Sequence, residues 1–133
     1  MSNVYARYTM NTAYVIMSEY SGYLNTFMCG GQCFAFSDGG AANAFIDAVK
    51  VSGCLRDGEE LYTCAINVYG AVAEPLEFKS YMWLSDSALN DMGIIILLDV
   101  YASAMSCQDN EERDRFCKRV LAEIKRKAAY HVG

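Results

Sequence analysis

Cysteine is the residue type best placed to do chemistry in this chain, since six cysteines accompany a single histidine. Cys29 and Cys33 are close enough to suggest a metal or redox pair, but three residues separate them in place of the usual two. The only histidine is His131, near the C-terminal end. We therefore expect neither a catalytic triad nor a Cys-His pair. We expect most cysteines to be reduced and packed as small apolar residues.

Two other patterns have the residue types of ligand sites without their spacing. The segment from Ser37 to Gly40 leads from a predicted strand into a predicted helix, as phosphate-binding loops do. It has neither the lysine of a P-loop nor the third glycine of a dinucleotide fingerprint. No spacing among the carboxylates fixes two of them across a cleft. The sequence therefore predicts no catalytic residue, no metal site and no cofactor.

The net charge of −5 is unevenly distributed. Residues 1–108 hold 4 Lys/Arg and 11 Asp/Glu, a net of −7, whereas residues 109–133 hold 7 and 5, a net of +2. An acidic body is unsuited to direct contact with nucleic acid, because that affinity rests on neutralising phosphates. It suits a basic surface on another protein, although it could also serve solubility alone. The residues that we expect at such a contact are acidic or aromatic: Asp57, Glu59, Glu60, Glu74, Glu77, Tyr14, Tyr20, Tyr23, Tyr81 and Trp83.

The stretch from Asn11 to Gly53 organises the predicted fold. Turns at Ser21-Gly22 and Gly30-Gly31 separate three apolar runs, which predicts a three-stranded antiparallel meander. If both loops have two residues, alternation sorts the side chains onto two faces. One face is largely aromatic and carries Tyr14, Ile16, Tyr20, Tyr23, Phe27, Phe34 and Phe36. The other is mainly aliphatic and carries Val15, Met17, Leu24, Met28, Cys33 and Ala35.

A helix is predicted after the meander, capped by Ser37 or Asp38 and ended by Gly53. Its alanines allow close approach to a sheet, so we expect it to cover the aliphatic face. The aromatic face is then either buried by the C-terminal helices or a binding surface. We favour burial, because large exposed apolar patches are uncommon on monomers.

The remainder of the chain predicts two more strands and a helical pair. Period-two alternation marks strands at 59–69 and 76–84, and weaker alternation at 3–9 suggests an extra strand. Helical spacing begins near Ser85, although the isoleucines from Ile94 make a buried strand a competing interpretation. Asp109 and Glu112 have the spacing of a capping box at the start of the last helix. The prediction is one α+β domain over residues 1–133, in the order β-β-β-α-β-β-α-α.

No motif identifies the function, and three hypotheses stay open. The first is a non-enzymatic protein-binding module that occupies a site on a larger partner. In size and charge the chain resembles small phage-encoded inhibitors of bacterial defence, including anti-CRISPR proteins. That resemblance implies an inhibitor of a nucleic-acid-handling protein, with carboxylates standing in for phosphates. The second is a small enzyme or ligand-binding domain using cysteine and tyrosine, and the third is a homo-oligomer, such as a homodimer, that buries the aromatic face.

Location can also be predicted from the sequence. The N-terminal residues lack a basic region followed by an apolar run, so no secretory signal is expected. The most apolar segment, residues 93–98, is too short to span a bilayer. We therefore expect a cytoplasmic protein that does not enter a membrane.

Overall fold

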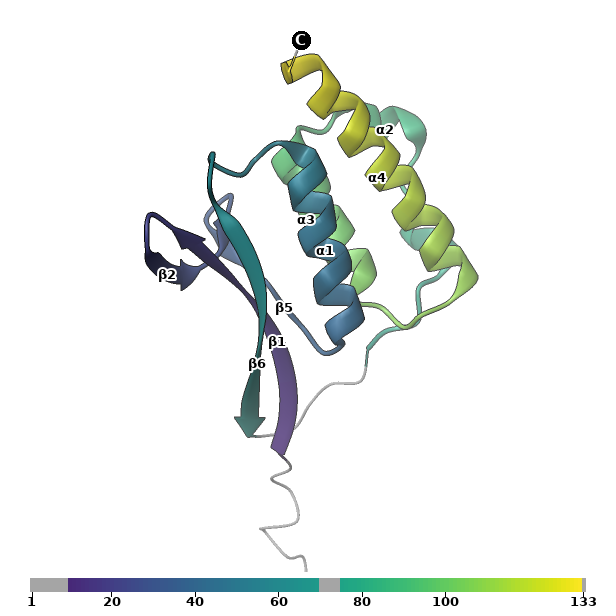
Figure 1. Cartoon of the computed structure of the whole chain (residues 1–133). Coiled ribbons are helices and arrows are strands. Elements are labelled where there is room, and N and C mark those ends of the chain that lie inside the picture. The colour runs from purple at the N-terminus through teal and green to yellow at the C-terminus, as the bar shows by residue number, and fades with distance from the viewer. Residues whose placement is uncertain (1–9, 70–74, 133) are drawn as a thin grey trace, which may run out of the picture.

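An antiparallel sheet with helices packed against one of its faces forms the α+β fold seen in the computed structural model (Figure 1). The structure describes residues 10–69 and 75–132. The strands are β1 (Met10–Tyr20), β2 (Tyr23–Thr26), β3 (Met28–Cys29), β4 (Gln32–Cys33), β5 (Ala35–Phe36) and β6 (Glu60–Tyr69). The helices are α1 (Gly39–Ser52), α2 (Asp86–Asp91), α3 (Ile94–Met105) and α4 (Glu111–Val132). The predicted class, with an antiparallel sheet and a C-terminal helical pair, is confirmed.

Strand β1 is the centre of the sheet. β6 pairs antiparallel with it from Met10 opposite Tyr69 to Glu19 opposite Glu60. The other side of β1 is shared, because β2 pairs with residues 17–20 and β5 pairs with residues 14–15. Between these two strands, β3 and β4 form a separate hairpin.

The predicted turns are confirmed, but the third strand pairs differently from the prediction. Tyr20 lies opposite Tyr23, and Cys29 lies opposite Gln32, as two-residue loops require. A plain meander would pair the third strand with the second, whereas β5 returns to β1. The meander is interrupted because Phe27 and Phe34, at the base of the β3–β4 hairpin, are both buried in the core.

The two loops share one backbone feature, a positive φ at both positions. The φ angles are 52° at Ser21 and 82° at Gly22, and 62° at Gly30 and 79° at Gly31. This is the geometry of the tight hairpin turns whose twist matches that of the flanking strands. Gly30 is also constrained by space, because a Cβ there would lie 2.8 Å from Cγ2 of Ile95 on α3. The hairpin tip therefore rests closely on α3.

Helix α1 covers the aromatic face of the sheet, so the prediction that it covers the aliphatic face is wrong. Phe45 of α1 is fully buried, with its ring centroid 4.5 Å from that of Phe34 and 5.5 Å from that of Phe36. Large rings remove more apolar area from water than the shorter aliphatic chains, which favours this arrangement. The expected burial of most of the aromatic face is thus confirmed, but α1 supplies it. The predicted ends of α1 are confirmed too, with Asp38 accepting from the Ala41 N–H and Gly53 at φ 75°.

The segment predicted as a strand at 76–84 is not one. It contains a three-residue 3-10 helix, Ser80–Met82, and lies against α4. The ring of Phe78 is buried 5.3 Å from that of Phe116, and Trp83 packs on Phe116 at 5.5 Å. Its alternation therefore reflects aromatic side chains inserted between helices and not strand pairing. Residues 3–9, the other suggested strand, lie outside the described residues.

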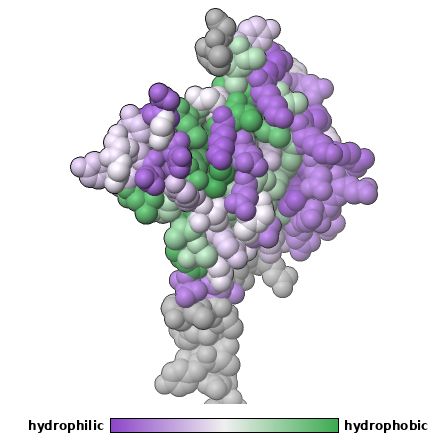
Figure 2. Space-filling view, viewed as in Figure 1, coloured by the Kyte–Doolittle hydropathy of each residue, from purple (hydrophilic) through white to green (hydrophobic). Residues whose placement is uncertain are grey.

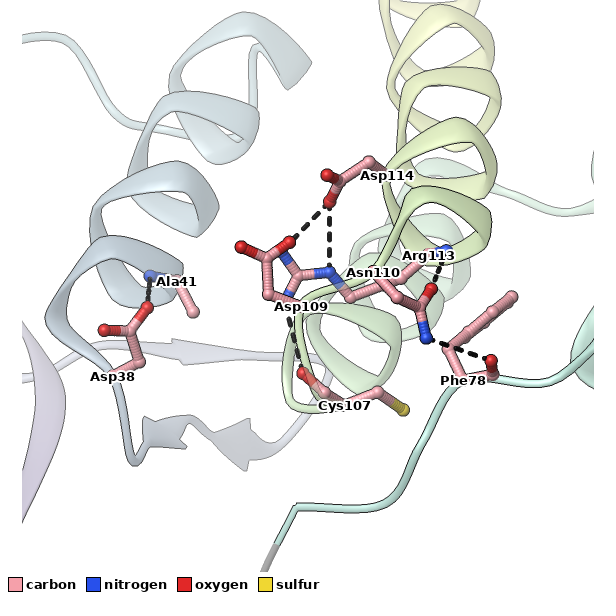
Figure 3. A network of polar contacts seen from close by, with 8 residues as sticks. All are labelled: Asp38, Ala41, Phe78, Cys107, Asp109, Asn110, Arg113 and Asp114. Atoms are coloured by element: carbon pink, nitrogen blue, oxygen red, sulfur yellow. Dashed lines mark hydrogen bonds and ion pairs between the residues drawn. The ribbon is translucent and has the colours of Figure 1, made fainter.

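The described chain from Asp86 onward consists of three helices joined by short connections, which decides between the two interpretations of the isoleucine segment in favour of helix α3. The α4 start differs from the expected capping box (Figure 3). Asn110 Oδ1 accepts from the Arg113 N–H at 2.8 Å, so Asn110 and not Asp109 caps the helix. The Arg113 guanidinium donates to the Cys107 carbonyl at 3.1 Å and contacts Asp109 and Asp114. Asp109 is therefore used as the arginine's ion-pair partner.

Candidate functional site

The aliphatic face of the sheet, here called the open face, has no helix over it among the residues that the structure describes (Figure 1). The register joins odd-numbered residues of β1 to even-numbered residues of β6 on this face. Ile66 is 41% exposed, Tyr62 42% and Leu24 60%. A contiguous exposed apolar face of this kind often marks an interaction site. The open face is made up of Val15, Met17, Leu24, Ala35, Tyr62, Cys64, Ile66 and Val68.

Two carboxylates lie at one end of the open face. Glu19 and Glu60 are directly opposite each other on neighbouring strands, and both are exposed. The Tyr62 hydroxyl donates to Glu60 Oε2 at 2.5 Å. This hydrogen bond, with some burial and the charges of both glutamates, raises the pKa of Tyr62 to about 12. Like charges directly opposite destabilise a sheet, so a cationic group from outside would be favourable here.

Glu59, the neighbour of Glu60, is already engaged inside the molecule. Its side chain is 7% exposed and accepts from the Ser18 hydroxyl at 2.5 Å and the Arg56 N–H at 3.0 Å. The Arg56 guanidinium reaches it at 3.3 Å and lies 3.7 Å over the Tyr20 ring. Burial alone would raise the pKa of Glu59, but these hydrogen bonds and the arginine charge outweigh it and hold the pKa below its ordinary value. Glu59 thus ties the loop before β6 to β1.

Replacing Glu59 with glutamine should make stability less sensitive to acid. The folded-state pKa lies below the ordinary value of 4.5, so the ionised group stabilises the fold above that pH. That contribution is lost as the pH falls through the folded-state pKa. Glu59→Gln should therefore cost about 1 to 2 kcal/mol at pH 7 and progressively less below pH 4.5. Urea unfolding at a series of pH values measures this cost. Glu77→Gln, at an exposed position, is the control and should follow the wild-type curve of stability against pH. Parallel curves for wild type and Glu59→Gln would contradict the stabilising role of the ionised Glu59.

Several of the predicted contact residues meet at this end of the sheet. Tyr20, Tyr23 and Glu59 line one hollow of about 260 Å³, together with Arg56. Tyr23 is 74% exposed. The hollow contains Ser18 and Tyr20 and therefore lies on the face that α1 covers, whereas Glu19 and Glu60 lie at the same end of β1 on the open face.

Other predicted contact residues lie elsewhere. Tyr81 is 76% exposed and Glu77 is exposed, but both belong to the segment that packs against α4. Trp83 is half-buried, with the Arg119 guanidinium 4.9 Å from its ring centroid. Asp57 is exposed in the loop before β6, and Tyr14 is half-buried. Glu74 lies outside the described residues.

The open face itself was missed by sequence reasoning, which assigned its β1 and β2 residues to the contact with α1. A signal was present in β6, where Tyr62, Cys64, Ile66 and Val68 form an apolar row. Alternation shows that such a row lies on one face. It does not show which face a helix covers.

The cysteines follow the prediction only in part. All six are free thiols; Cys117 is buried, and Cys33, Cys54 and Cys64 are exposed. Burial raises the pKa of Cys29 and Cys107, and it raises that of Cys117 to about 12. Thiols with raised pKa values are poor nucleophiles at neutral pH. Within residues 10–69 and 75–132, no group of three or more His, Cys, Asp or Glu side chains is arranged to hold a metal ion.

Comparison of the chain with protein-family models, curated proteins and solved structures found no match. The function must therefore be argued from the surface of the molecule. In the described part of the chain, no helix has both the length and the apolar character needed to cross a membrane.

Proposed function

We propose that this chain is a non-enzymatic protein-binding module, and that its open face receives a partner with an apolar patch beside a basic group. The observation that carries the proposal is an apolar sheet face that no described helix covers, with Glu19 opposite Glu60 at its end. Burying exposed apolar area contributes about 25 cal/mol per Å². A basic group of the partner would relieve the repulsion between the two carboxylates.

The distribution of charge supports a basic partner at this end of the molecule. Glu19, Asp57 and Glu60 are exposed near the end of β1, whereas the charge of Glu59 is matched by Arg56. Such a concentration of one sign steers a partner of the opposite sign.

The basic residues of α4 have a different use. Arg119 pairs with Asp86 of α2, and the Lys127 ammonium donates to the Asn90 carbonyl at 2.6 Å. These contacts tie α2 to α4, on the side of the molecule away from the sheet. Figure 2 shows that the outer surface of α4 is largely hydrophilic, whereas apolar residues gather toward the sheet and α1. The two sides of the molecule are therefore chemically distinct.

A narrower form of the proposal is a stoichiometric inhibitor of a nucleic-acid-handling protein. Its support is the acidic charge and the resemblance in size and charge to small phage-encoded inhibitors of bacterial defence. In this form the carboxylates at the end of the open face take the place of phosphates on the partner's basic surface.

The test is retention of a partner from a lysate of the source cell or its host, at low and then at high salt, with mass spectrometry. Glu19→Lys with Glu60→Lys should weaken retention of a basic protein about tenfold or more, because it reverses the charge that meets the partner. Glu77→Lys with Asp91→Lys is the matched control, since it changes the net charge equally at exposed positions on the other side. Ile66→Ser should also weaken retention, through the apolar face. Equal retention by the two double variants would refute the proposed surface.

A further inference from the structure

Within residues 10–69 and 75–132, strand β6 is paired along one edge only. It pairs with β1 along residues 60–69, and no described backbone group pairs with its other side. Natural edge strands are usually protected by lysine, proline, a bulge or short length. β6 has ten residues, and from Leu61 to Tyr69 it contains no charged residue and no proline. An edge of this kind is a template for another strand.

The register shows which backbone groups reach the free edge. The Phe27 N–H donates to the Ile16 carbonyl at 2.9 Å, so the backbone groups of Ile16 point toward β2. Those of the neighbouring Val15 therefore point toward β6 and bond with Cys64, which lies opposite. Backbone direction alternates along a strand, so the even-numbered residues of β6 face β1. The groups that face the free edge are those of Leu61, Thr63, Ala65, Asn67 and Tyr69.

We propose that β6 pairs antiparallel with β6 of a second copy of this chain, about a two-fold axis at Ala65. The five outward residues are symmetric about Ala65, so Thr63 lies opposite Asn67 of the second copy and each outward donor meets an acceptor. The pairing forms about ten backbone hydrogen bonds. It joins the two sheets into one, with the helices of both copies on the same side.

The side chains of β6 favour a second copy of this chain as the strand that pairs with its free edge. On the open face this register places Tyr62 opposite Val68 of the second copy, and Cys64 opposite Ile66. Aromatic and β-branched pairs of this kind stabilise antiparallel sheets. On the other face the small Ala65 meets itself at the axis. The one charged residue, Glu60, lies at the outer end, about 30 Å from Glu60 of the second copy at the strand rise of about 3.3 Å per residue.

The dimer can form without the proposed partner. Edge pairing leaves both open faces uncovered and places them side by side in one sheet. Loss of the dimer would separate the two open faces. Each copy would keep its own open face, with Glu19 opposite Glu60 at its end.

The first test is the mass in solution over a dilution series, by light scattering or sedimentation. We expect twice the chain mass at high micromolar concentration and dissociation on dilution. Ala65→Pro removes the central outward N–H and no hydrogen bond to β1, so it should be monomeric at concentrations where the wild type is dimeric. Ala35→Pro is the matched control, because Ala35 is an exposed alanine of β5 whose backbone groups also point away from β1. It should remain dimeric. A monomeric wild type, or a dimer that survives Ala65→Pro, would overturn the proposal.

Amide hydrogen exchange of the wild type supplies a test that needs no variant. In the dimer the outward amides of Ala65 and Asn67 should exchange slowly, and faster on dilution. The inward amides of Cys64 and Ile66 should be protected at every concentration, because they bond to β1. Rapid exchange of Ala65 and Asn67 in a sample with the dimeric mass would overturn the assignment of β6 as the interface.

Discussion

Replacing Phe45 with alanine should lower the free energy of unfolding by about 3 to 5 kcal/mol. The ring is fully buried and lies against Phe34 and Phe36, so truncation leaves a cavity between α1 and the sheet. Domains of this size have a total stability of about 5 to 15 kcal/mol. The loss is therefore a large fraction of the total stability. Urea unfolding followed by circular dichroism measures the loss.

Tyr23→Ala is the control for Phe45→Ala, because it also deletes an aromatic ring but at a position that is 74% exposed. It should change stability by no more than about 0.5 kcal/mol. A loss below about 1 kcal/mol for Phe45→Ala would show that α1 does not pack on the aromatic face as described. It would reopen the question of which face is free to bind a partner.

The second large effect is expected at Asn110, whose side chain joins two parts of the chain (Figure 3). Its Oδ1 caps α4 by accepting from the Arg113 N–H at 2.8 Å. Its Nδ2 donates to the carbonyl of the buried Phe78 at 3.2 Å. Asn110→Ala removes the cap, worth about 1 kcal/mol, and leaves the Phe78 carbonyl without this donor, at about 1 to 2 kcal/mol. We expect a total loss of about 2 to 3 kcal/mol in urea unfolding.

Asn110→Asp separates the two contributions. Aspartate caps a helix as well as asparagine and suits the positive end of the helix dipole. It cannot donate to the Phe78 carbonyl, so it should lose the second contribution and keep the first. The order of stability should be wild type, then Asn110→Asp, then Asn110→Ala. Equal losses for the two variants would mean that the cap contributes nothing.

The proposed dimer and the proposed partner binding would reinforce each other. Two open faces in one sheet can engage a partner with two similar sites, and linked sites bind more tightly than either alone. The Ala65→Pro variant should then bind such a partner more weakly than the Ala35→Pro control, although its Glu19–Glu60 pair is intact. The oligomeric state and the partner can thus be tested separately and then together.

Local features of the fold followed from the sequence alone. The two hairpin turns, a helix cap at Ser37 or Asp38 and the Gly53 end of α1 were all predicted. Each depends on a few consecutive residues, such as glycine at positive φ or a carboxylate three residues before an N–H. The helical period of the last segment likewise predicted α4, because its charged and apolar residues repeat at helical spacing over many turns.

Tertiary packing decided what those elements contact. Alternation divided the sheet residues into an aromatic and an aliphatic set, but it could not tell which set α1 covers. That choice depends on where the bulky rings of Phe34, Phe36 and Phe45 fit together. The packing of large side chains in the core also pairs β5 with β1. It places Phe78 beneath α4, in a segment where alternation predicted a strand.

The candidate site illustrates the same division. Tyrosines and glutamates near the end of β1 were predicted as contact residues from their types, and Tyr20, Tyr23 and Glu59 line one hollow there, on the face that α1 covers. The apolar open face was not identified, because a half-buried strand has the same pattern whichever of its faces meets the core. Only the packing of helices on one side of the sheet shows that no described element covers the other side, since burial is a property of the whole fold and not of any one segment.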